Sequence, residues 1–161
     1  MIRKILMVLL AALVIIQFIH PKKNKSEENQ PNFIGNTFPV PADVKSILAK
    51  ACNDCHSNNT KYPWYTNIQP LHWFMDKHII GGKKEMNLDE YTSRSLRYQY
   101  KKMDDLKEQI KEGEMPLDSY TWMHKNAKLT EEEKNKLIAW ADGIRDTLKA
   151  KYPIDSLMKK K

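Results

Sequence analysis

The stretch Cys52-Asn53-Asp54-Cys55-His56 decides how this chain of 161 residues is interpreted. Two thiols three positions apart can form thioethers with the two vinyl groups on one edge of a haem, and an imidazole that follows at once can bind the iron. The sequence therefore predicts a covalently bound c-type haem as the cofactor. Cys52 and Cys55 are the expected attachment points, and His56 is the expected proximal iron ligand.

Two other kinds of site use the same side chains. A redox-active Cys-x-x-Cys pair usually follows a strand, but no alternating β pattern precedes Cys52. A structural zinc site needs four closed ligands, whereas the chain has two cysteines and no second histidine pair with finger-like spacing. A disulfide and a zinc-holding accessory module stay as the alternatives to haem.

The first twenty residues resemble an export signal or a membrane anchor. Arg3 and Lys4 precede an apolar run over residues 5–19. This run is shorter than the roughly 20 residues of a full membrane span, and no Ala-x-Ala-like cleavage site follows it. We expect a retained signal anchor at residues 1–20, with a cleaved signal peptide as the alternative. Covalent haem attachment occurs outside the bacterial cytoplasmic membrane, so we expect the domain on its periplasmic side.

The remaining chain divides into a tether, one domain and a tail. Residues 21–41 are polar and contain prolines, which is typical of a linker. Residues 42–150 form one expected domain, because the chain is too short for two ordinary ones. Residues 151–161 are expected to form a basic tail. No strand pattern is present, so the predicted fold class is all-α.

Apolar residues at helical spacing predict four helices. They are expected from Ala42 to Ala51, from Pro70 to a stop at Gly81-Gly82, from Asn87 to Gly113 with a break near Tyr100, and from a capping box at Thr130 to Leu148. The expected inner faces are Val44, Ile47, Leu48 and Ala51 in the first helix, Leu71, Phe74, Met75, His78 and Ile79 in the second, and Leu137, Trp140, Ala141, Ile144 and Leu148 in the last.

The sixth iron ligand decides between an electron carrier and an open haem site. Met115 is the favoured distal ligand, because it precedes Pro116 in a loop between two expected helices and a thioether favours reduced iron. A core methionine that fills a gap is the alternative. His78 is the rival ligand, since an imidazole on an apolar face needs a reason to be there. His72, His124 and Met123 are weaker candidates.

Aromatic side chains and charge give less specific indications. Trp64 and Tyr65 are expected to pack against the porphyrin, with ordinary core packing as the alternative. The formal charge of +7 fits a docking face for an acidic redox partner or an anionic lipid surface, but also an ordinary solvated surface. No motif supports nucleic-acid binding.

The chain resembles a family of small bacterial haem-binding domains related to mono-haem c-type cytochromes. The resemblance covers about residues 40–145. It lies in residues 51–58, in Tyr62-Pro63-Trp64-Tyr65 with the following Ile68-Gln69-Pro70, and in residues 114–117 before Lys128-Leu129-Thr130. It implies a cytochrome c-like helical fold around the haem, with the same Cys52, Cys55 and His56 roles and with Met115 as the distal ligand. The extra length between Pro70 and Gly113 departs from a minimal cytochrome and leaves room for His78.

These inferences lead to one expected function and one alternative. We expect a membrane-tethered periplasmic protein that holds one haem c and its iron and passes single electrons to redox partners of the membrane or periplasm. Such a protein is a carrier and not an enzyme. The alternative is a haem enzyme or sensor, either peroxidase-like or gas-responsive, with an open distal site.

Overall fold

The structure is a computed structural model that describes residues 1–158, and this part of the chain contains helices and no β-strand. The all-α prediction is confirmed. In chain order the elements are α1 (Ile2–Ile16), η1 (Ile34–Asn36), α2 (Ala42–Ala51), α3 (Asn53–His56), η2 (Trp64–Asn67), α4 (Leu71–Glu85), η3 (Leu88–Ser93), α5 (Leu96–Glu112), α6 (Asp118–Met123), η4 (Lys125–Ala127), α7 (Glu131–Lys151) and α8 (Ile154–Leu157).

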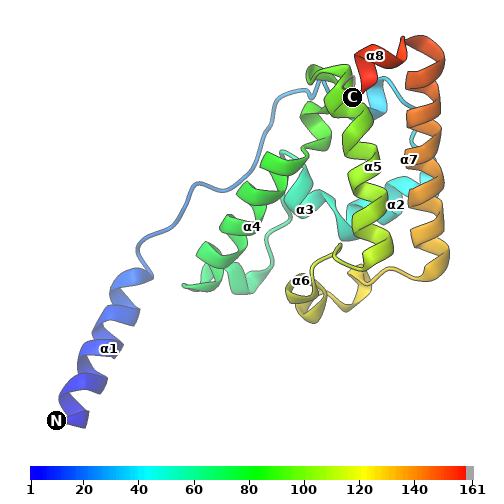
Figure 1. The fold of residues 1–161 in the computed structure, drawn as a ribbon. Coiled ribbons are helices and arrows are strands. Elements are labelled where there is room, and N and C mark those ends of the chain that lie inside the picture. The colour runs from blue at the N-terminus through cyan, green and yellow to red at the C-terminus, as the bar shows by residue number, and fades with distance from the viewer. Residues whose placement is uncertain (159–161) are drawn as a thin grey trace.

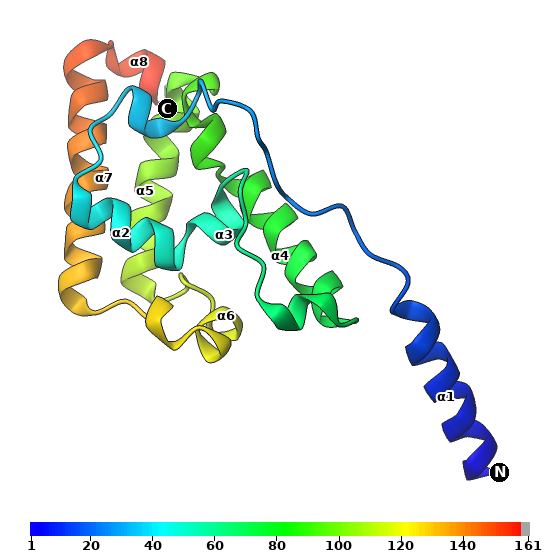
Figure 2. The same cartoon turned by 180° about the vertical axis from the view of Figure 1, so that it is seen from behind.

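The main core lies between α5, α7 and α2. The first two lie side by side, and α2 crosses them (Figures 1 and 2). The indole of Trp140 donates a hydrogen bond of 3.0 Å to the carbonyl of Pro39 and so fixes α7 to the segment before α2. The buried apolar side chains of these helices are Val44, Ile47, Leu48, Tyr100, Met103, Ile110, Leu137, Trp140, Ala141, Ile144 and Leu148.

The expected faces of α2 and α7 are confirmed. Val44, Ile47 and Leu48 are buried, Ala51 packs against them from a partly buried position, and every expected apolar residue of α7 is buried. The capping box at Thr130 is also present, because its side chain and that of Glu133 each accept a backbone N–H of the other residue. Three carboxylates in the first turn further stabilise the N-terminus of α7, because they interact favourably with the positive end of the helix dipole.

The inner face of α4 is confirmed only in part, since Met75 and Ile79 are buried as expected and the other expected residues are not. His72, Met75 and Ile79 are buried, whereas Leu71 and Phe74 are exposed to 43% and 53%. The helix also continues through Gly81-Gly82 to Glu85 instead of stopping there. Both corrections have one cause: α4 packs against α3 at Gly82, where an added Cβ would lie 2.7 Å from the carbonyl oxygen of Cys55. This close approach fixes which side of α4 faces inward.

The region between α4 and α7 contains more structure than expected. Asn87 caps the short helix η3 through a bond from the Asp89 amide, and a separate cap at Ser95 begins α5. The predicted break near Tyr100 is wrong, since α5 runs unbroken and the buried Tyr100 belongs to its packed face. The expected loop after Gly113 contains α6 and η4.

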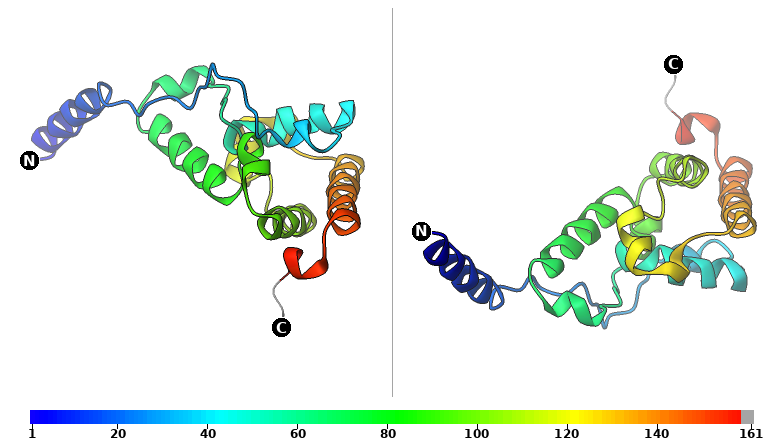
Figure 3. Two further views of the ribbon diagram at one scale, coloured as in Figure 1. Left: turned by 90° about the horizontal axis from the view of Figure 1, so that it is seen from above. Right: turned by 90° about the horizontal axis from the view of Figure 1, so that it is seen from below.

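The first and last described helices, α1 and α8, lie on opposite sides of the molecule (Figure 1). The N-terminal helix α1 projects away from the other helices and buries none of its residues (Figure 3). Among the described residues, no helix is both long enough and apolar enough to cross a bilayer. The expected tether is partly packed, because Ile34 and Phe38 are buried in the core. The expected tail contains α8, whose Leu157 is buried, and its last residues, 159–161, lie outside the described part.

Candidate functional site

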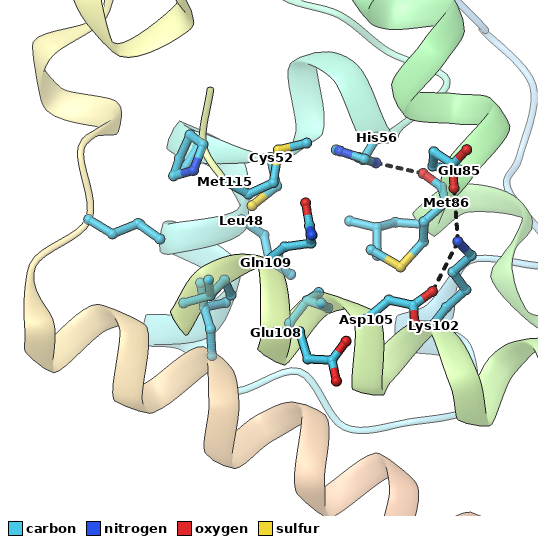
Figure 4. Close-up of a pocket in the computed structure, with 17 residues that line it drawn as sticks. Leu48, Cys52, His56, Glu85, Met86, Lys102, Asp105, Glu108, Gln109 and Met115 are labelled. Atoms are coloured by element: carbon cyan, nitrogen blue, oxygen red, sulfur yellow. Dashed lines mark hydrogen bonds and ion pairs between the residues drawn. The ribbon is translucent and has the colours of Figure 1, made fainter. Parts of the chain in front are cut away.

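A cavity of about 340 Å³ lies at the junction of α2, α3, α5 and the segment that follows α5 (Figure 4). Its walls are mostly apolar. Leu48 and Ala51 come from α2, Leu106 and Ile110 from α5, and Leu137 from α7. Because α2 and α5 belong to the main core, two walls of the cavity are part of the packed helices.

Cys52 and His56 line this cavity together with Met115 (Figure 4). Cys52 ends α2 and caps α3, and His56 is the last residue of α3. Met115 enters from α5: Gly113 ends this helix with a left-handed φ of +77°, and the amide of Met115 then donates to the Gln109 carbonyl over 3.2 Å. Residues from two separate parts of the chain, the Cys52–His56 segment and the segment after α5, therefore meet at one mostly apolar cavity.

The His56 ring is oriented by a backbone hydrogen bond. Its Nδ1 lies 2.8 Å from the carbonyl oxygen of Met86, and a carbonyl can only accept, so Nδ1 carries the proton. Burial lowers the pKa of His56, while hydrogen bonds to the backbone of Met86 and Gly82 oppose this change. The neutral ring thus keeps the Nε2 lone pair available, which is the arrangement seen in metal-ligating histidines.

Both cysteines are protonated thiols at neutral pH. Burial raises the pKa of Cys52 to about 12 and that of Cys55 to about 11. A reactive Cys-x-x-Cys pair instead depends on a lowered thiol pKa. The disulfide alternative therefore lacks the electrostatic environment that such chemistry uses.

The zinc alternative lacks a donor cluster. Nowhere in residues 1–158 do three or more histidine, cysteine or carboxylate side chains converge so that they could hold a metal ion. A structural zinc site needs four such donors. The described residues therefore give a zinc-holding module no support.

The other predicted site residues lie outside the cavity lining. His78 is on α4, where its Nδ1 lies 2.7 Å from the carbonyl oxygen of Phe74. Trp64 is 76% exposed, and the hydroxyl of Tyr65 lies 3.1 Å from Nε2 of His124. Cys55 faces α4 instead, at the close approach to Gly82.

A charged rim at one end of the cavity was missed by the sequence analysis. Lys102 forms ion pairs with Glu85 at 3.0 Å and Asp105 at 3.2 Å, and all three residues line the cavity. Burial alone would lower the pKa of Lys102, but the hydrogen bonds to both carboxylates outweigh it and raise that pKa. The spacing of Lys102 and Asp105 on one helix was a visible signal, whereas the contribution of Glu85 depends on how α4 and α5 meet.

The donor set fits a haem better than a bare metal ion. An imidazole with a free Nε2 and a thioether sulfur are a known axial pair, and they line the same apolar cavity as one of the two thiols. Fold and site together define a small all-helical domain with a mostly apolar cavity beside its Cys-x-x-Cys-His segment.

Comparison with known proteins agrees with this class. The family model described as haem-binding domain matches residues 11–143, so the chain belongs to the haem-binding domain family. It is also similar to the cytochrome c peroxidase Ccp of Escherichia coli strain K12, with 27% identity over 122 residues. That match covers 74% of this chain but only 26% of the peroxidase, so the chain spans about a quarter of its relative's length. No solved structure matches the chain.

Proposed function

We propose that this protein is a mono-haem c-type electron carrier that is tethered to the membrane on the periplasmic side. The observation that carries the proposal is that His56 and Met115, from different parts of the chain, line one apolar cavity together with Cys52. When bound, the haem supplies an iron that gains and loses one electron at a time. The chain supplies attachment, two axial ligands and exclusion of water.

Each group of residues has a distinct part in this proposal. Cys52 and Cys55 hold the haem covalently, and His56 binds its iron through Nε2 while the Met86 carbonyl orients the ring. Met115 would supply the second iron ligand, and its neutral thioether would favour the reduced state, Fe(II). The apolar walls act in the same direction, since a site of low polarity disfavours the more highly charged oxidised centre.

The proposed location rests on the N-terminal segment. Apart from Arg3 and Lys4, the side chains of α1 are apolar, and none of its residues is buried against the domain, so this apolar surface is free to enter a lipid phase. Covalent haem attachment takes place outside the bacterial cytoplasm, which favours the periplasmic side. A tether of this kind raises the local concentration of the carrier near membrane partners.

The proposed partners are redox proteins of the membrane or periplasm. Similarity to a quarter of a cytochrome c peroxidase suggests one class in particular, namely haem peroxidases that need an electron donor. In that arrangement this domain delivers electrons and the peroxidase carries out the reaction.

Absorption spectra of the ferric and ferrous protein, made with the c-type maturation machinery, test the ligand assignment. For the parent and for His78→Ala we expect a low-spin, six-coordinate spectrum, because His78 lies outside the cavity lining. For Met115→Ala we expect loss of the sixth ligand and rapid binding of carbon monoxide to the ferrous form. Six-coordinate iron in Met115→Ala, lost instead in His78→Ala, would contradict the assignment.

A second candidate function is a peroxidase-like haem enzyme with an open distal site. The similarity to a cytochrome c peroxidase favours it. It predicts five-coordinate iron in the parent and a spectrum that Met115→Ala leaves unchanged, so the same measurements separate the two candidates.

A further inference from the structure

Asp54 lies inside the Cys52–His56 segment and accepts three hydrogen bonds. It is not one of the residues that define the Cys-x-x-Cys-His motif. Its Oδ1 accepts a hydrogen bond from the Lys61 amide at 2.9 Å, and its carbonyl accepts one from the hydroxyl of Thr60 at 2.6 Å. Its Oδ2 accepts a bond from the hydroxyl of Tyr120 at 2.8 Å. Asp54 is 9% exposed, so this last bond is largely shielded from water.

Tyr120 belongs to α6, which begins directly after the segment that carries Met115. The amide of Tyr120 donates to the Leu117 carbonyl at 2.9 Å, so the first turn of α6 reaches back to within two residues of Met115. Burial raises the pKa of Tyr120, and its bond to Asp54 acts in the same direction. The hydroxyl therefore remains a donor over the whole physiological pH range.

A second contact fixes the same helix. The ring of His124 stacks on that of Tyr120, with centroids 4.1 Å apart, and its Nδ1 lies 3.1 Å from the Tyr120 carbonyl oxygen. Because this carbonyl can only accept, Nδ1 carries the proton and Nε2 accepts from the Tyr65 hydroxyl at 3.1 Å. Tyr65 thus contacts α6 through His124.

The segment of Met115 is therefore held from both directions along the chain. On the α5 side its amide is bonded to the carbonyl of Gln109. On the α6 side the restraint is the hydrogen bond between Tyr120 and Asp54, which lies two residues before the proximal His56. The two expected iron ligands come from segments that this bond joins.

We propose that Asp54 and Tyr120 are positioning residues that hold the Met115 segment against the cavity and so determine how tightly Met115 closes the distal side of the haem. This inference rests on the proposed function, because it takes Met115 as the distal ligand. Neither residue touches the reacting centre in this role. Each acts through the position of Met115.

The test compares Tyr120→Phe with Tyr91→Phe in the full-length haem-loaded protein. Each change removes one hydrogen-bonding tyrosine hydroxyl; that of Tyr91 donates to the Gln99 carbonyl at 2.7 Å and lies outside the cavity lining. Two quantities are measured: the rate at which the ferrous protein binds carbon monoxide, and amide hydrogen exchange over residues 114–123. The exchange measurement reports on the segment itself and does not depend on haem activity.

We expect Tyr120→Phe to raise both quantities by about tenfold, because a partly buried hydrogen bond to a carboxylate is lost. Tyr91→Phe should match the parent in both quantities. Asp54→Asn should give values between those of the parent and those of Tyr120→Phe, since an amide oxygen can still accept one of the two hydrogen bonds. Asp54→Asn also serves as the second variant if Tyr120→Phe fails to mature.

Three outcomes overturn the inference. If Tyr120→Phe and Asp54→Asn both match the parent, the bond does not position Met115, and the proposed function stands. If Tyr91→Phe changes both quantities as much as Tyr120→Phe, the effect is general loss of stability. If the parent itself binds carbon monoxide rapidly and Met115→Ala changes nothing, the inference and the proposed function fail together.

Discussion

The imidazole of His56 shows how one backbone contact decides what a side chain can do. The Met86 carbonyl lies 2.8 Å from Nδ1 and can only accept a hydrogen bond, so the proton is placed there and Nε2 is left free. The sequence showed that His56 was a candidate ligand but not which nitrogen would be available. That depends on the end of α4, thirty residues further along the chain.

His72 provides a prediction about pH at the residue scale. Its ring is 1% exposed, its Nε2 has no hydrogen-bond partner, and its Nδ1 lies 3.2 Å from that of His20. Burial lowers the pKa of His72, and the nearby His20 adds to this. Since the unfolded chain binds the proton more readily, the stability that depends on neutral His72 is complete above pH 6.5 and is lost as the pH falls.

Urea unfolding of the protein in detergent between pH 8 and pH 5 measures this effect. The free energy of unfolding of the parent should fall by up to about 1.4 kcal/mol per pH unit for the one proton involved. His72→Gln should flatten that slope, whereas His78→Gln, at a partly exposed ring on the same helix, should keep it. A slope that His72→Gln leaves unchanged would show that this ring does not titrate on unfolding.

At the scale of elements, the close packing of α4 on α3 makes a second prediction. A Cβ at Gly82 would lie 2.7 Å from the Cys55 carbonyl oxygen, which is backbone and cannot turn aside. Gly82→Ala should therefore destabilise the protein by about 1–3 kcal/mol and lower the yield of attached haem. Gly81→Ala is the matched control, because its Cβ would meet nothing within 4 Å. It should stabilise the helix by up to about 1 kcal/mol.

Thermal unfolding of both variants, with the haem content of each preparation, checks this prediction. If Gly82→Ala and Gly81→Ala change stability and haem content equally, the close contact between α3 and α4 does not contribute to either. The pair is informative because the residues are neighbours in sequence and share helix propensity, and they differ only in what lies next to them.

The capping box of α7 gives a third prediction. The Thr130 hydroxyl accepts from the Glu133 amide at 3.2 Å, so Thr130→Ala should cost about 1 kcal/mol in the free energy of unfolding. Thr147→Ala, inside the same helix, removes only a bond to the preceding turn and should change stability much less. Denaturant titration of both variants measures the difference, and similar losses for the two would argue against a specific role of the cap.

These elements also show how far the sequence could be read. The faces of α2 and α7 were predicted because each helix packs on one continuous apolar surface, and Val44 and Leu137 are both buried. The face of α4 was predicted only in part: Met75 and Ile79 are buried as expected, but the burial of His72 was missed, because the contact between Gly82 and Cys55 leaves no periodic signal. The cavity residues from separate elements, such as Glu85 and Lys102, were missed for the same reason.

At the scale of the whole molecule, the domain and α1 are separate in their packing. The domain encloses its cavity with α2, α5 and α7, whereas α1 leaves its apolar side chains exposed (Figure 1). Residues between them are partly fixed, because the side chain of Asn24 donates to the carbonyl of Ser57 at 2.9 Å. This arrangement is compatible with the proposed membrane tether.

Membrane association tests the tether. Leu9 lies in the middle of α1 and is 60% exposed, and a carboxylate at the centre of an apolar segment costs about 2.5–3.5 kcal/mol in a bilayer. Leu9→Asp should therefore shift the protein from the floating to the soluble fraction when membranes are separated by density. Asn29→Asp adds the same charge within the tether and should leave the protein with the membranes. Retention of Leu9→Asp would contradict anchoring through α1.

The central claim, that a haem is bound covalently through Cys52 and Cys55, is tested most directly by denaturing the matured protein and extracting it with acidified organic solvent. The account predicts that the visible colour stays with the polypeptide, that its mass exceeds that of the chain by one haem, and that a variant with both cysteines changed to alanine loses the colour. Complete transfer of the colour from the parent protein into the solvent would contradict the claim.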